Sequence, residues 1–414
     1  MVFEMRMRRD RDGRIVEKVE RVAGEPVAWT YSYDKSGRLF EAHLDGRLIC
    51  QCHYDREGRR RQDVFPLTHG PSVRNYRYGV GNRLQSAGNN SYTHDANGFR
   101  LLWNHEGAYT RYEYAPDHRL LKATRESEGV VFEFDHDDNG QRAAKYRDGQ
   151  LVEGYQWLDF LRLGVFFDGR FAYRFLYDEG GRTPVAMERE DGLDLTLHYD
   201  QIGSLRAVAD SSGRVIKEIL YDPFGGVVRD TNPALRIPIG FAGGLHDRDL
   251  GFVRFGWRDY DTFTSRWTAP DPMGDAGGDP DWYGYCLDDP VNGVDPLGLF
   301  RFGKKGLFGL PAIGKEGTTA DKGNYQLKHE QGFYEDGTGD NVGLFRDGLE
   351  FNENINDYEL DDTHFDDERM RKAQASLDPG EYKLFKMGGK SNNCQDYADR
   401  LRERYRFLRT AERY

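Results

Sequence analysis

The sequence predicts a mainly β protein, in which short hairpins form a sheet that curls into a shell, followed by a small α+β domain. The first observation is the composition, because 49 Gly, 25 Tyr and 25 Phe among 414 residues favour short strands joined by tight turns. The second is a repeated unit that combines an aromatic residue, an Asp and a Gly. The third is that residues 300–414 lack this unit and change in composition.

The repeated unit has alternating aromatic and polar residues, then an Asp, a few small polar residues, a Gly and an Arg or Leu. Its copies read YSYDKSGRL, CHYDREGRR, SYTHDANGFRL, FEFDHDDNGQR, FLYDEGGR, LHYDQIGSLR and LYDPFGGVVR. The aromatic anchors are Tyr33, Tyr54, Tyr92, Tyr114, Phe134, Tyr177, Tyr199 and Tyr221. Adjacent anchors are 20–22 residues apart, and the two longer steps of 38 and 43 residues are close to two periods.

Each unit predicts one β-hairpin. Alternation of aromatic and polar residues is typical of a strand with one buried face. The Asp side chain can bond to the backbone two residues further on, and Gly adopts the positive φ that such a turn needs. A single hairpin cannot bury its aromatic face alone, so we expect stacked hairpins to form a long sheet that curls.

Charge and cysteine content exclude several classes of protein. The net charge of −12 argues against a general nucleic-acid or membrane-surface binder. No apolar run is long enough for a membrane-spanning helix, and the start of the chain lacks the apolar segment of a secretory signal. The four cysteines, Cys50, Cys52, Cys286 and Cys394, fit neither a disulfide framework nor a zinc site. We expect no cofactor and no bound metal.

The repeats resemble the YD repeats of Rhs proteins and of the C component of insecticidal toxin complexes, over about residues 25–300. In that family the repeats form a hollow β-shell around a C-terminal toxin. The resemblance divides the chain into a repeat region (1–239), an Rhs-associated core (240–299) and a variable toxin domain (300–414). The core is identified by GWRDYD, RW, PDPMG, WYGY and PVNGVDPLGL, in that order.

The resemblance implies that the core is an aspartic autoprotease that cuts after the terminal Leu, here at Leu299–Phe300. It assigns the catalytic carboxylates to Asp271 and Asp295, which would share a proton, and a supporting positive charge to Arg258. Asp-Pro pairs are also common in turns, so these residues could be turn formers only. Asp259, Asp261 and Asp289 are weaker candidates, whose spacing is typical of strands and turns.

The last 115 residues predict a small α+β domain. Residues 366–377 and 393–409 carry apolar residues at helical spacing. Residues 381–387 alternate as a strand, and residues 341–351 predict a hairpin. Cys394 lies in the first turn of the last helix, where the helix dipole favours a thiolate. The alternative is a buried structural cysteine.

Residues 339–348 and 391–405 resemble circularly permuted papain-like (NlpC/LRAT-type) cysteine enzymes, which cleave or transfer acyl groups. This resemblance implies Cys394 as nucleophile. It places the His near Asn341, but the only histidines after residue 300 are His329 and His364. We favour His364, which precedes a predicted helix, as the base, with His329 as the alternative and Asn341 as a positioning amide.

Three functions follow. The first is a polymorphic toxin with a self-cleaving shell and a cysteine-hydrolase payload, used against competing bacteria. The second is a nuclease payload, in which the pairs Asp361-Asp362 and Asp366-Asp367 would hold Mg²⁺. The third is a shell or delivery fragment with an inactive payload. A zinc deaminase is disfavoured, because its sequence signatures are missing. The family implies a cognate immunity protein, delivery components and synthesis in the bacterial cytoplasm before secretion by a type VI-like system.

Overall fold

The computed structural model describes residues 2–24, 26–272 and 281–296, together with the C-terminal strands named below and residues 370, 371, 373, 374 and 401. The chain divides into two compact units. One consists of Met1–Pro272 and Asp281–Pro296, and the other of Met273–Pro280 and Leu297–Tyr414. No helix among the described residues is long and apolar enough to span a membrane.

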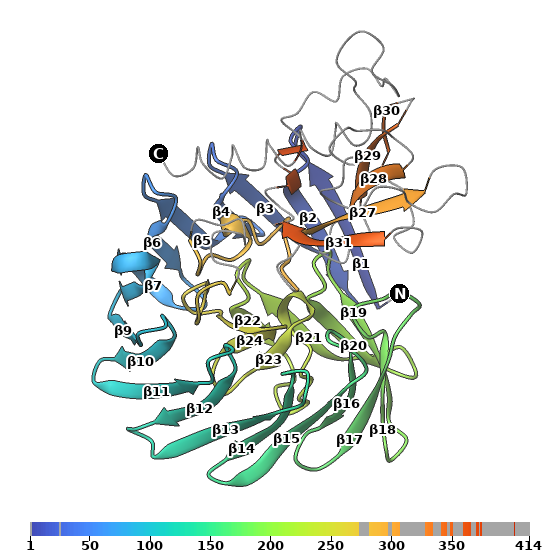
Figure 1. Cartoon of the computed structure of the whole chain (residues 1–414). Coiled ribbons are helices and arrows are strands. Elements are labelled where there is room, and N and C mark those ends of the chain that lie inside the picture. Colours follow the sequence, from blue (N-terminus) through green and yellow to red (C-terminus); the bar gives the residue numbers. More distant parts are fainter. Residues whose placement is uncertain are drawn as a thin grey trace. The chain divides into compact units, whose positions relative to one another are not determined.

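The first unit consists mainly of one sheet of 22 strands (Figure 1). Its strands are β1 (Phe3–Arg9), β2 (Ile15–Val22), β3 (Val27–Tyr33), β4 (Leu39–Leu44), β5 (Arg47–Tyr54), β6 (Arg60–Phe65), β7 (Gly70–Tyr78), β8 (Leu84–Ala87), β9 (Asn90–His94), β10 (Arg100–His105), β11 (Ala108–Tyr114), β12 (Leu120–Arg125), β13 (Val130–His136), β14 (Arg142–Arg147), β15 (Gln150–Trp157), β16 (Leu163–Phe167), β17 (Ala172–Leu176), β18 (Ala186–Arg189), β19 (Asp194–Tyr199), β20 (Leu205–Asp210), β21 (Val215–Tyr221) and β22 (Val227–Asp230).

Each strand of this sheet pairs antiparallel with the next strand in the sequence. The prediction of a β-dominated region built from hairpins is therefore confirmed. The sheet begins earlier than the expected residue 25, because β1 and β2 already form a hairpin around a turn at Asp10–Arg14.

The Asp-Gly turns close as the sequence predicts. In the turn at Asp34 the backbone N–H of Asp34 donates to the carbonyl of Arg38 at 2.9 Å, and Asp34 Oδ1 accepts the N–H groups of Ser36 and Arg38. Gly37 has φ +86°, the left-handed region that glycine enters without strain. The same main-chain closure recurs at Asp10, Asp55, Asp95, Asp137, Asp200, Asp210 and Asp222.

The two long steps between anchors contain turns whose first residue is not Asp. Gly79 donates its N–H to the carbonyl of Arg83, and Leu158 does the same to Arg162, both at 2.8 Å. Main-chain hydrogen bonds close both turns, and in the second turn the Asp lies one position later, where Asp159 Oδ1 accepts the N–H groups of Leu161 and Arg162. This explains why a search for the Asp-containing pattern passes over them.

Tyrosine side chains connect successive hairpins. The hydroxyl of Tyr54 donates to the carbonyl of Leu39 at 2.7 Å, and its ring lies over the guanidinium of Arg38 at 4.3 Å. Tyr33, Tyr78 and Tyr177 make equivalent bonds to the carbonyls of Ile15, Arg60 and Leu163. The regular spacing of the repeat therefore places each of these tyrosines at the residue that follows the turn of an earlier unit.

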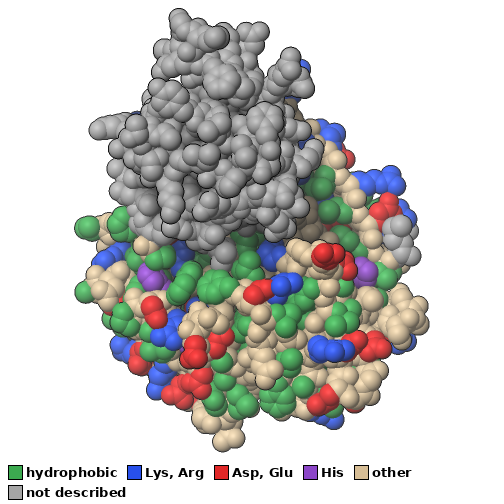
Figure 2. Space-filling model, turned by 45° about the vertical axis from the view of Figure 1, so that its right-hand side comes forward, with side chains coloured by type: hydrophobic (Ala, Val, Ile, Leu, Met, Phe, Trp, Pro, Cys, Tyr) green, Lys and Arg blue, Asp and Glu red, His purple; other side chains and the backbone are tan. Residues whose placement is uncertain are grey.

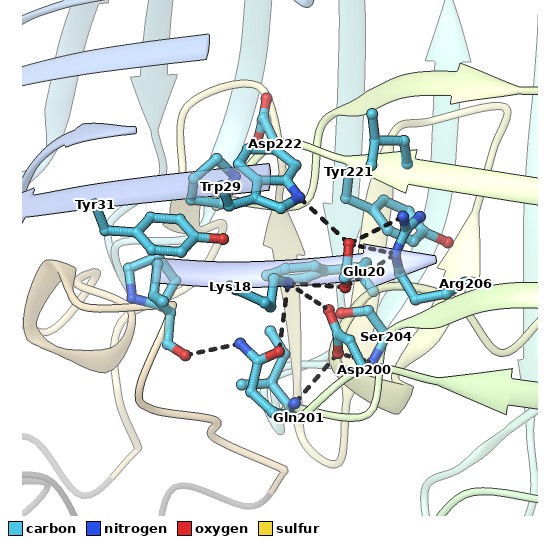
Figure 3. A pocket seen from close by; sticks show the side chains of 16 residues that line it. Lys18, Glu20, Trp29, Tyr31, Asp200, Gln201, Ser204, Arg206, Tyr221 and Asp222 are labelled. Carbon is cyan, nitrogen blue, oxygen red and sulfur yellow. Dashed lines mark hydrogen bonds and ion pairs between the residues drawn. The ribbon is translucent and has the colours of Figure 1, made fainter. Parts of the chain in front are cut away.

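The sheet curls until β20 returns to β2 (Figure 1). A buried ionic network joins the two strands at this closure, which we call the seam (Figure 3). Glu20 binds Arg206 at 3.1 Å and Lys18 at 3.1 Å, and Lys18 also lies 3.6 Å from Asp200. The pocket in the seam has a volume of about 30 Å³, room for a single water molecule. The seam is therefore a packed closure.

Residues 231–272 and 281–296 pack against the inner side of this sheet. They contain a four-stranded sheet of β23 (Leu245–Asp247), β24 (Phe252–Phe255), β25 (Arg258–Asp261) and β26 (Arg266–Trp267). This segment also contains the short 3₁₀ turns η2 (Phe241–Gly243) and η4 (Cys286–Asp288), and η1 (Val80–Asn82) precedes β8 in the large sheet. Buried aromatic rings, with Tyr260 and Tyr285 4.4 Å apart, form the core where this segment meets the large sheet.

The second unit contains an antiparallel five-stranded sheet with the order β30-β29-β28-β27-β31. Its strands are β27 (Phe300–Gly306), β28 (Lys328–Phe333), β29 (Asn341–Phe345), β30 (Gly348–Glu350) and β31 (Glu359–Phe365). The β29–β30 pair confirms the predicted hairpin. Residues 370, 371, 373, 374 and 401 are helical, as predicted, and the expected strand at 381–387 lies outside the described residues.

Candidate active site

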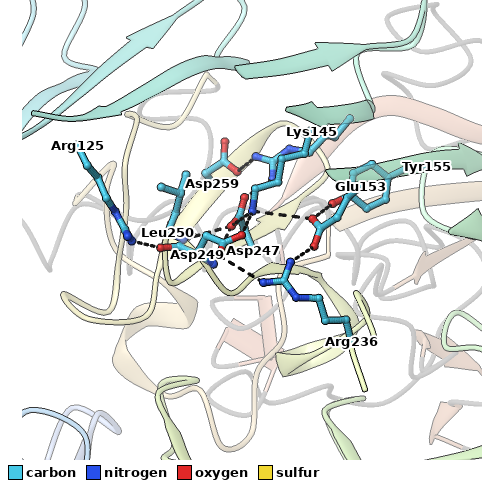
Figure 4. A network of polar contacts seen from close by, with 10 residues as sticks. Arg125, Lys145, Glu153, Tyr155, Arg236, Asp247, Asp249, Leu250 and Asp259 are labelled. Carbon is cyan, nitrogen blue, oxygen red and sulfur yellow. Dashed lines mark hydrogen bonds and ion pairs between the residues drawn. The ribbon is translucent and has the colours of Figure 1, made fainter. Parts of the chain in front are cut away.

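Residues 231–272 and 281–296 form what we call the inner segment, and the sheet of 22 strands forms what we call the wall. Buried ion pairs fix the inner segment to the wall (Figure 4). Arg142 on β14 binds Asp247 at 3.0 Å and Asp259 at 3.2 Å, and Lys145 binds Asp247 at 2.7 Å. These side chains are almost completely buried. Because a buried charge without a partner is costly, the strand β25 can occupy only the position that pairs these groups. That position determines where Arg258, the first residue of β25, lies.

The weaker carboxylate candidates have structural partners. Asp259 also binds Arg254 at 3.1 Å, and Asp261 binds Arg100 at 2.7 Å. Asp289 accepts hydrogen bonds from the side-chain amide of Asn292 at 2.9 and 3.0 Å. These contacts agree with the interpretation that the three carboxylates have structural roles in strands and turns.

The three residues that the sequence assigned to cleavage lie together. Arg258 Nη2 lies 2.8 Å from Asp271 Oδ2 and 3.5 Å from Asp295 Oδ2. The Arg258 side chain is 8 % exposed, and those of Asp271 and Asp295 are 16 % and 17 % exposed. Asp271 and Asp295, which are 24 positions apart in the sequence, thus both contact the Arg258 guanidinium. Their carboxylates are close enough to the surface for water to enter.

Two tryptophans hold the arginine in place. The guanidinium of Arg258 lies 4.1 Å from the ring centre of Trp267, a geometry that favours a cation. The carbonyl of Trp282 accepts a bond from Arg258 Nη1 at 3.4 Å and from the N–H of Asp271 at 2.8 Å. One carbonyl therefore orients both the arginine and the backbone that carries the first carboxylate.

This arrangement can support acid–base chemistry. In general acid–base catalysis by two carboxyl groups, one member of the pair is ionised and the other is protonated. The ionised member can accept a proton from water while the protonated member donates one. Among the described residues no cluster of His, Cys, Asp and Glu could hold a metal ion.

His118 is a neighbour of this site that sequence reasoning missed. Burial and the positive charge of Arg258 lower the pKa of His118, while the Asp271 carboxylate acts in the opposite direction. The signal for His118 was present in the sequence, because YEYAPDHRL carries Ala and His where other units have Asp and Gly.

The candidates of the toxin domain are placed only in part. β27 lies between β28 and β31, with Lys305 opposite His329 and Arg301 opposite His364. His364 thus lies in the strand β31. Asn341 is the first residue of β29. Cys394 and Leu299 lie outside the described residues, so the cysteine–histidine pair and the position of the scissile bond stay predictions.

The candidate metal ligands of the alternative function are also placed only in part. Asp361 and Asp362 lie in β31, and Asp366 and Asp367 lie outside the described residues. On the described part of the face that Figure 2 shows, positive and negative side chains are intermixed and do not gather into one charged patch.

Residues 1–278 match the family model described as Teneurin YD-shell. Teneurin-1 from Gallus gallus is 31% identical over 280 residues, which are 65% of this chain and 10% of teneurin-1. The tRNA3(Ser)-specific nuclease WapA from Bacillus spizizenii is 25% identical over 273 residues, which are 64% of this chain and 12% of WapA. The chain therefore spans about a tenth of the length of these curated relatives.

A solved structure entitled "Crystal Structure of TcdB2-TccC3-Cdc42" is also similar, with 20% sequence identity and a TM-score of 0.48. The similarity covers 72% of this chain and 17% of that chain.

Proposed function

Because this chain belongs to the teneurin YD-shell family of YD-repeat proteins, we propose that it is a self-cleaving toxin of the Rhs type. In this proposal residues 1–239 form the wall, residues 240–299 carry an aspartic cleavage site, and residues 300–414 are the payload. Cleavage of the Leu299–Phe300 bond separates the payload from the shell.

One observation supports the cleavage proposal most strongly: Arg258 Nη2 contacts both Asp271 and Asp295. One carboxylate takes a proton from water, and the water oxygen attacks the carbonyl carbon of Leu299. The other carboxylic acid donates its proton to the carbonyl oxygen, which gives a gem-diol. When the gem-diol collapses, the first carboxyl group donates the proton it took from water to the departing nitrogen of Phe300, and the second carboxylate takes a proton back from a hydroxyl of the gem-diol. The products are a Leu299 carboxylate and a new amino terminus at Phe300.

The cleavage site is tested by intact mass spectrometry under denaturing conditions, because the fragments could remain associated. We expect the native chain to yield two species, one ending at Leu299 and one beginning at Phe300. Asp271→Asn and Asp295→Asn should leave the chain whole, since each removes one of the two carboxylates.

The matched control is Asp12→Asn, whose side chain is 73 % exposed, and we expect it not to affect cleavage. Processing at Leu299 that survives both Asp271→Asn and Asp295→Asn would remove the assignment. Arg258→Lys keeps the charge but not the planar guanidinium, so we expect slower cleavage and not a complete loss.

For the payload, we infer a cysteine hydrolase or acyltransferase with Cys394 as nucleophile and His364 as base. His329 is the alternative base, and Asn341 positions the substrate. The supporting observation is sequence resemblance, and both histidines lie on strands that flank β27. We further propose that the producer makes a cognate immunity protein and delivers the toxin to other bacteria through a type VI-like system.

A nuclease is the second candidate for the payload, because one relative is named as a tRNA-specific nuclease. Expression of the full chain in bacteria separates the two, with the native chain compared with Cys394→Ala and Asp271→Asn. Toxicity that disappears in Cys394→Ala supports the hydrolase. Toxicity that persists in Cys394→Ala, together with degraded cellular RNA or DNA, supports the nuclease. An absence of toxicity from the native chain supports an inactive payload.

A further inference from the structure

A buried tyrosine of the inner segment is bonded to a turn of the wall. Tyr283 belongs to the WYGY motif, to which the proposed reaction assigns no role. Its side chain is 2 % exposed, and its hydroxyl donates to the carbonyl of Gly98 at 2.7 Å. Gly98 lies 185 residues earlier in the chain, in the turn between β9 and β10.

The turn accepts this hydroxyl because residue 98 is glycine. Gly98 has φ +91° and donates its N–H to the carbonyl of Asp95 at 3.1 Å, as glycine does in the other Asp-Gly turns. A Cβ atom at this position would lie 2.6 Å from the Tyr283 hydroxyl oxygen, whereas the next atoms, on the Arg83 guanidinium, are 3.4 Å away. A methyl group here would therefore push the hydroxyl away and leave Arg83 in ordinary contact.

The backbone around Tyr283 reaches the cleavage site by two routes. The carbonyl of Trp282 accepts the N–H of Asp271 at 2.8 Å and Arg258 Nη1 at 3.4 Å. The carbonyl of Tyr283 accepts the N–H of Trp267 at 3.0 Å, and the ring centre of Trp267 lies 4.1 Å from the Arg258 guanidinium. A shift of this backbone would therefore move the arginine that contacts both carboxylates.

A second anchor holds the same segment without Tyr283. Asp281 binds Arg266 at 2.5 and 2.7 Å, and Arg266 also donates to the carbonyl of Asn82, between β7 and β8, at 3.0 Å. The N–H of Arg100, which follows the Gly98 turn, donates to the carbonyl of Thr268 at 2.9 Å. Loss of the Tyr283 hydroxyl should therefore displace the backbone locally and not release the inner segment.

We propose that Tyr283 is a positioning residue of the cleavage site, which couples the docking of the inner segment on the β9–β10 turn to the placement of Arg258 and Asp271. The proposal rests on the proposed self-cleavage. With the hydroxyl bound to Gly98, the Trp282 carbonyl is held where it orients both groups. Because acid–base catalysis needs its groups within hydrogen-bond reach, a small displacement slows the reaction. Cleavage is thereby confined to chains whose inner segment has docked on the wall.

The test is a double-mutant cycle between Gly98 and Tyr283. Full-length chain is made by cell-free translation with a radioactive label, synthesis is stopped, and the fragments are followed on denaturing gels and identified by mass spectrometry. We expect Tyr283→Phe to cleave about fivefold more slowly, as the loss of one hydrogen bond predicts. Gly98→Ala should cleave about thirtyfold more slowly, because its Cβ atom also displaces the tyrosine.

The double substitution Gly98→Ala/Tyr283→Phe decides between displacement and a general effect of alanine. It has no hydroxyl for the Cβ atom to displace, so we expect it to cleave about as fast as Tyr283→Phe and faster than Gly98→Ala. Gly107→Ala is the matched control, since Gly107 has φ +92° and a Cβ atom there would have no neighbour within 4 Å among the described residues. Its cleavage rate should equal that of the native chain.

Folding is measured separately in the Asp295→Asn background, where cleavage does not interfere. Tryptophan fluorescence after dilution from urea gives the folding rate, and a urea titration gives the stability of each variant. A merely structural role of Tyr283 would slow folding by the same factor as cleavage, whereas a positioning role slows cleavage in chains that are already folded. If Gly98→Ala shows no cooperative urea transition, Tyr283→Phe decides the outcome.

The outcomes distinguish this proposal from the proposed function. Slower cleavage by Tyr283→Phe with unchanged folding, together with rescue of Gly98→Ala by the second substitution, supports the role of Tyr283. A native rate in Tyr283→Phe, a double variant no faster than Gly98→Ala, or cleavage and folding slowed by the same factor overturns it. A native chain that does not cut at Leu299, or an Asp271→Asn chain that does, overturns the proposed function itself.

Discussion

The same residue in the same turn behaves differently at two places in the wall. Asp34 is paired with Arg38 and its side chain is 22 % exposed. Asp222 accepts bonds from the N–H groups of Phe224 and Gly226 and from the Thr68 hydroxyl, and it is 2 % exposed. Burial raises the pKa of Asp222 to about 6. A repeat motif therefore specifies the backbone of the turn but not the charge state of its Asp.

The raised pKa of Asp222 predicts that the stability of the folded chain depends on pH. Its pKa is higher in the folded chain than the ordinary 3.8, so its stabilising contribution is complete below that value and is lost as the pH rises through about 6. Asp222→Asn keeps an acceptor oxygen and removes the charge. Relative to the native chain, we expect its unfolding free energy to improve by about 3 kcal/mol between pH 4 and pH 7, measured by urea titration.

Asp10 is the control for this prediction, because its contribution to stability changes with pH in the opposite direction. Burial acts to raise the pKa of Asp10, but hydrogen bonds from Arg14 outweigh it and lower the pKa. Asp10 therefore stabilises the chain above its ordinary pKa, and this contribution is lost as the pH falls. Asp10→Asn should lose stability relative to the native chain as the pH rises. Parallel profiles for Asp222→Asn and Asp10→Asn would contradict both assignments.

At the scale of the hairpin, the tyrosine of the repeat links one unit to another. The sequence predicted that Tyr54 packs in the sheet, but not that its hydroxyl binds the carbonyl of Leu39. That bond depends on how far one hairpin is displaced from another, and no pattern within a single unit encodes this displacement.

Tyr54→Phe measures this link. The substitution keeps the ring over Arg38 and removes one hydrogen bond to a partly buried carbonyl, which should cost about 1 kcal/mol of unfolding free energy. Tyr146→Phe is the matched control, because its hydroxyl binds Asp135 at the exposed surface. Equal losses in the two variants would show that the inter-hairpin bond contributes nothing specific.

The strand that follows the proposed scissile bond also bears on the payload. Phe300, the residue after the predicted scissile bond, begins β27, which lies between β28 and β31. Residues 300–306 pair on both sides with strands that come later in the chain.

At the scale of the whole unit, closure depends on charges buried between distant strands. Burial acts to raise the pKa of Glu20, but Lys18 and Arg206 outweigh it and hold the pKa below its ordinary value. Asn292 adds a second connection, since its side-chain oxygen accepts the N–H of Ile15 on β2 at 2.8 Å. The inner segment thus fastens the beginning of the sheet as well as carrying the carboxylate pair.

Removal of Glu20 should open the seam. Glu20→Ala leaves Arg206 and Lys18 buried without their partner, which costs about 3–5 kcal/mol. We expect a lower urea midpoint and faster hydrogen exchange in β1–β3 and β19–β21 than in β11–β13. Glu17→Ala, which breaks an exposed pair with Arg8, should change stability by less than about 1 kcal/mol. Uniform exchange across the sheet after Glu20→Ala would contradict a local seam.

The hairpins and their turns could be predicted from the sequence, and so could the residues proposed for the cleavage site. Each turn closes within five residues, so its Asp and Gly are neighbours in the chain and their pattern is legible. Asp271, Asp295 and Arg258 were identified by an ordered series of motifs, and the structure brings them together. These signals are local, or they are carried by a family resemblance.

Tertiary structure alone decided which buried charges meet. Arg206 and Glu20 are 186 residues apart, Arg100 and Asp261 161, and Arg142 and Asp247 105. Each charge in the sequence has many possible partners, and desolvation selects among them only when the sheet has curled and excluded water. His118 belongs to the same class. Its departure from the repeat is visible in the sequence, but its position beside Arg258 and Asp271 exists only in the folded shell.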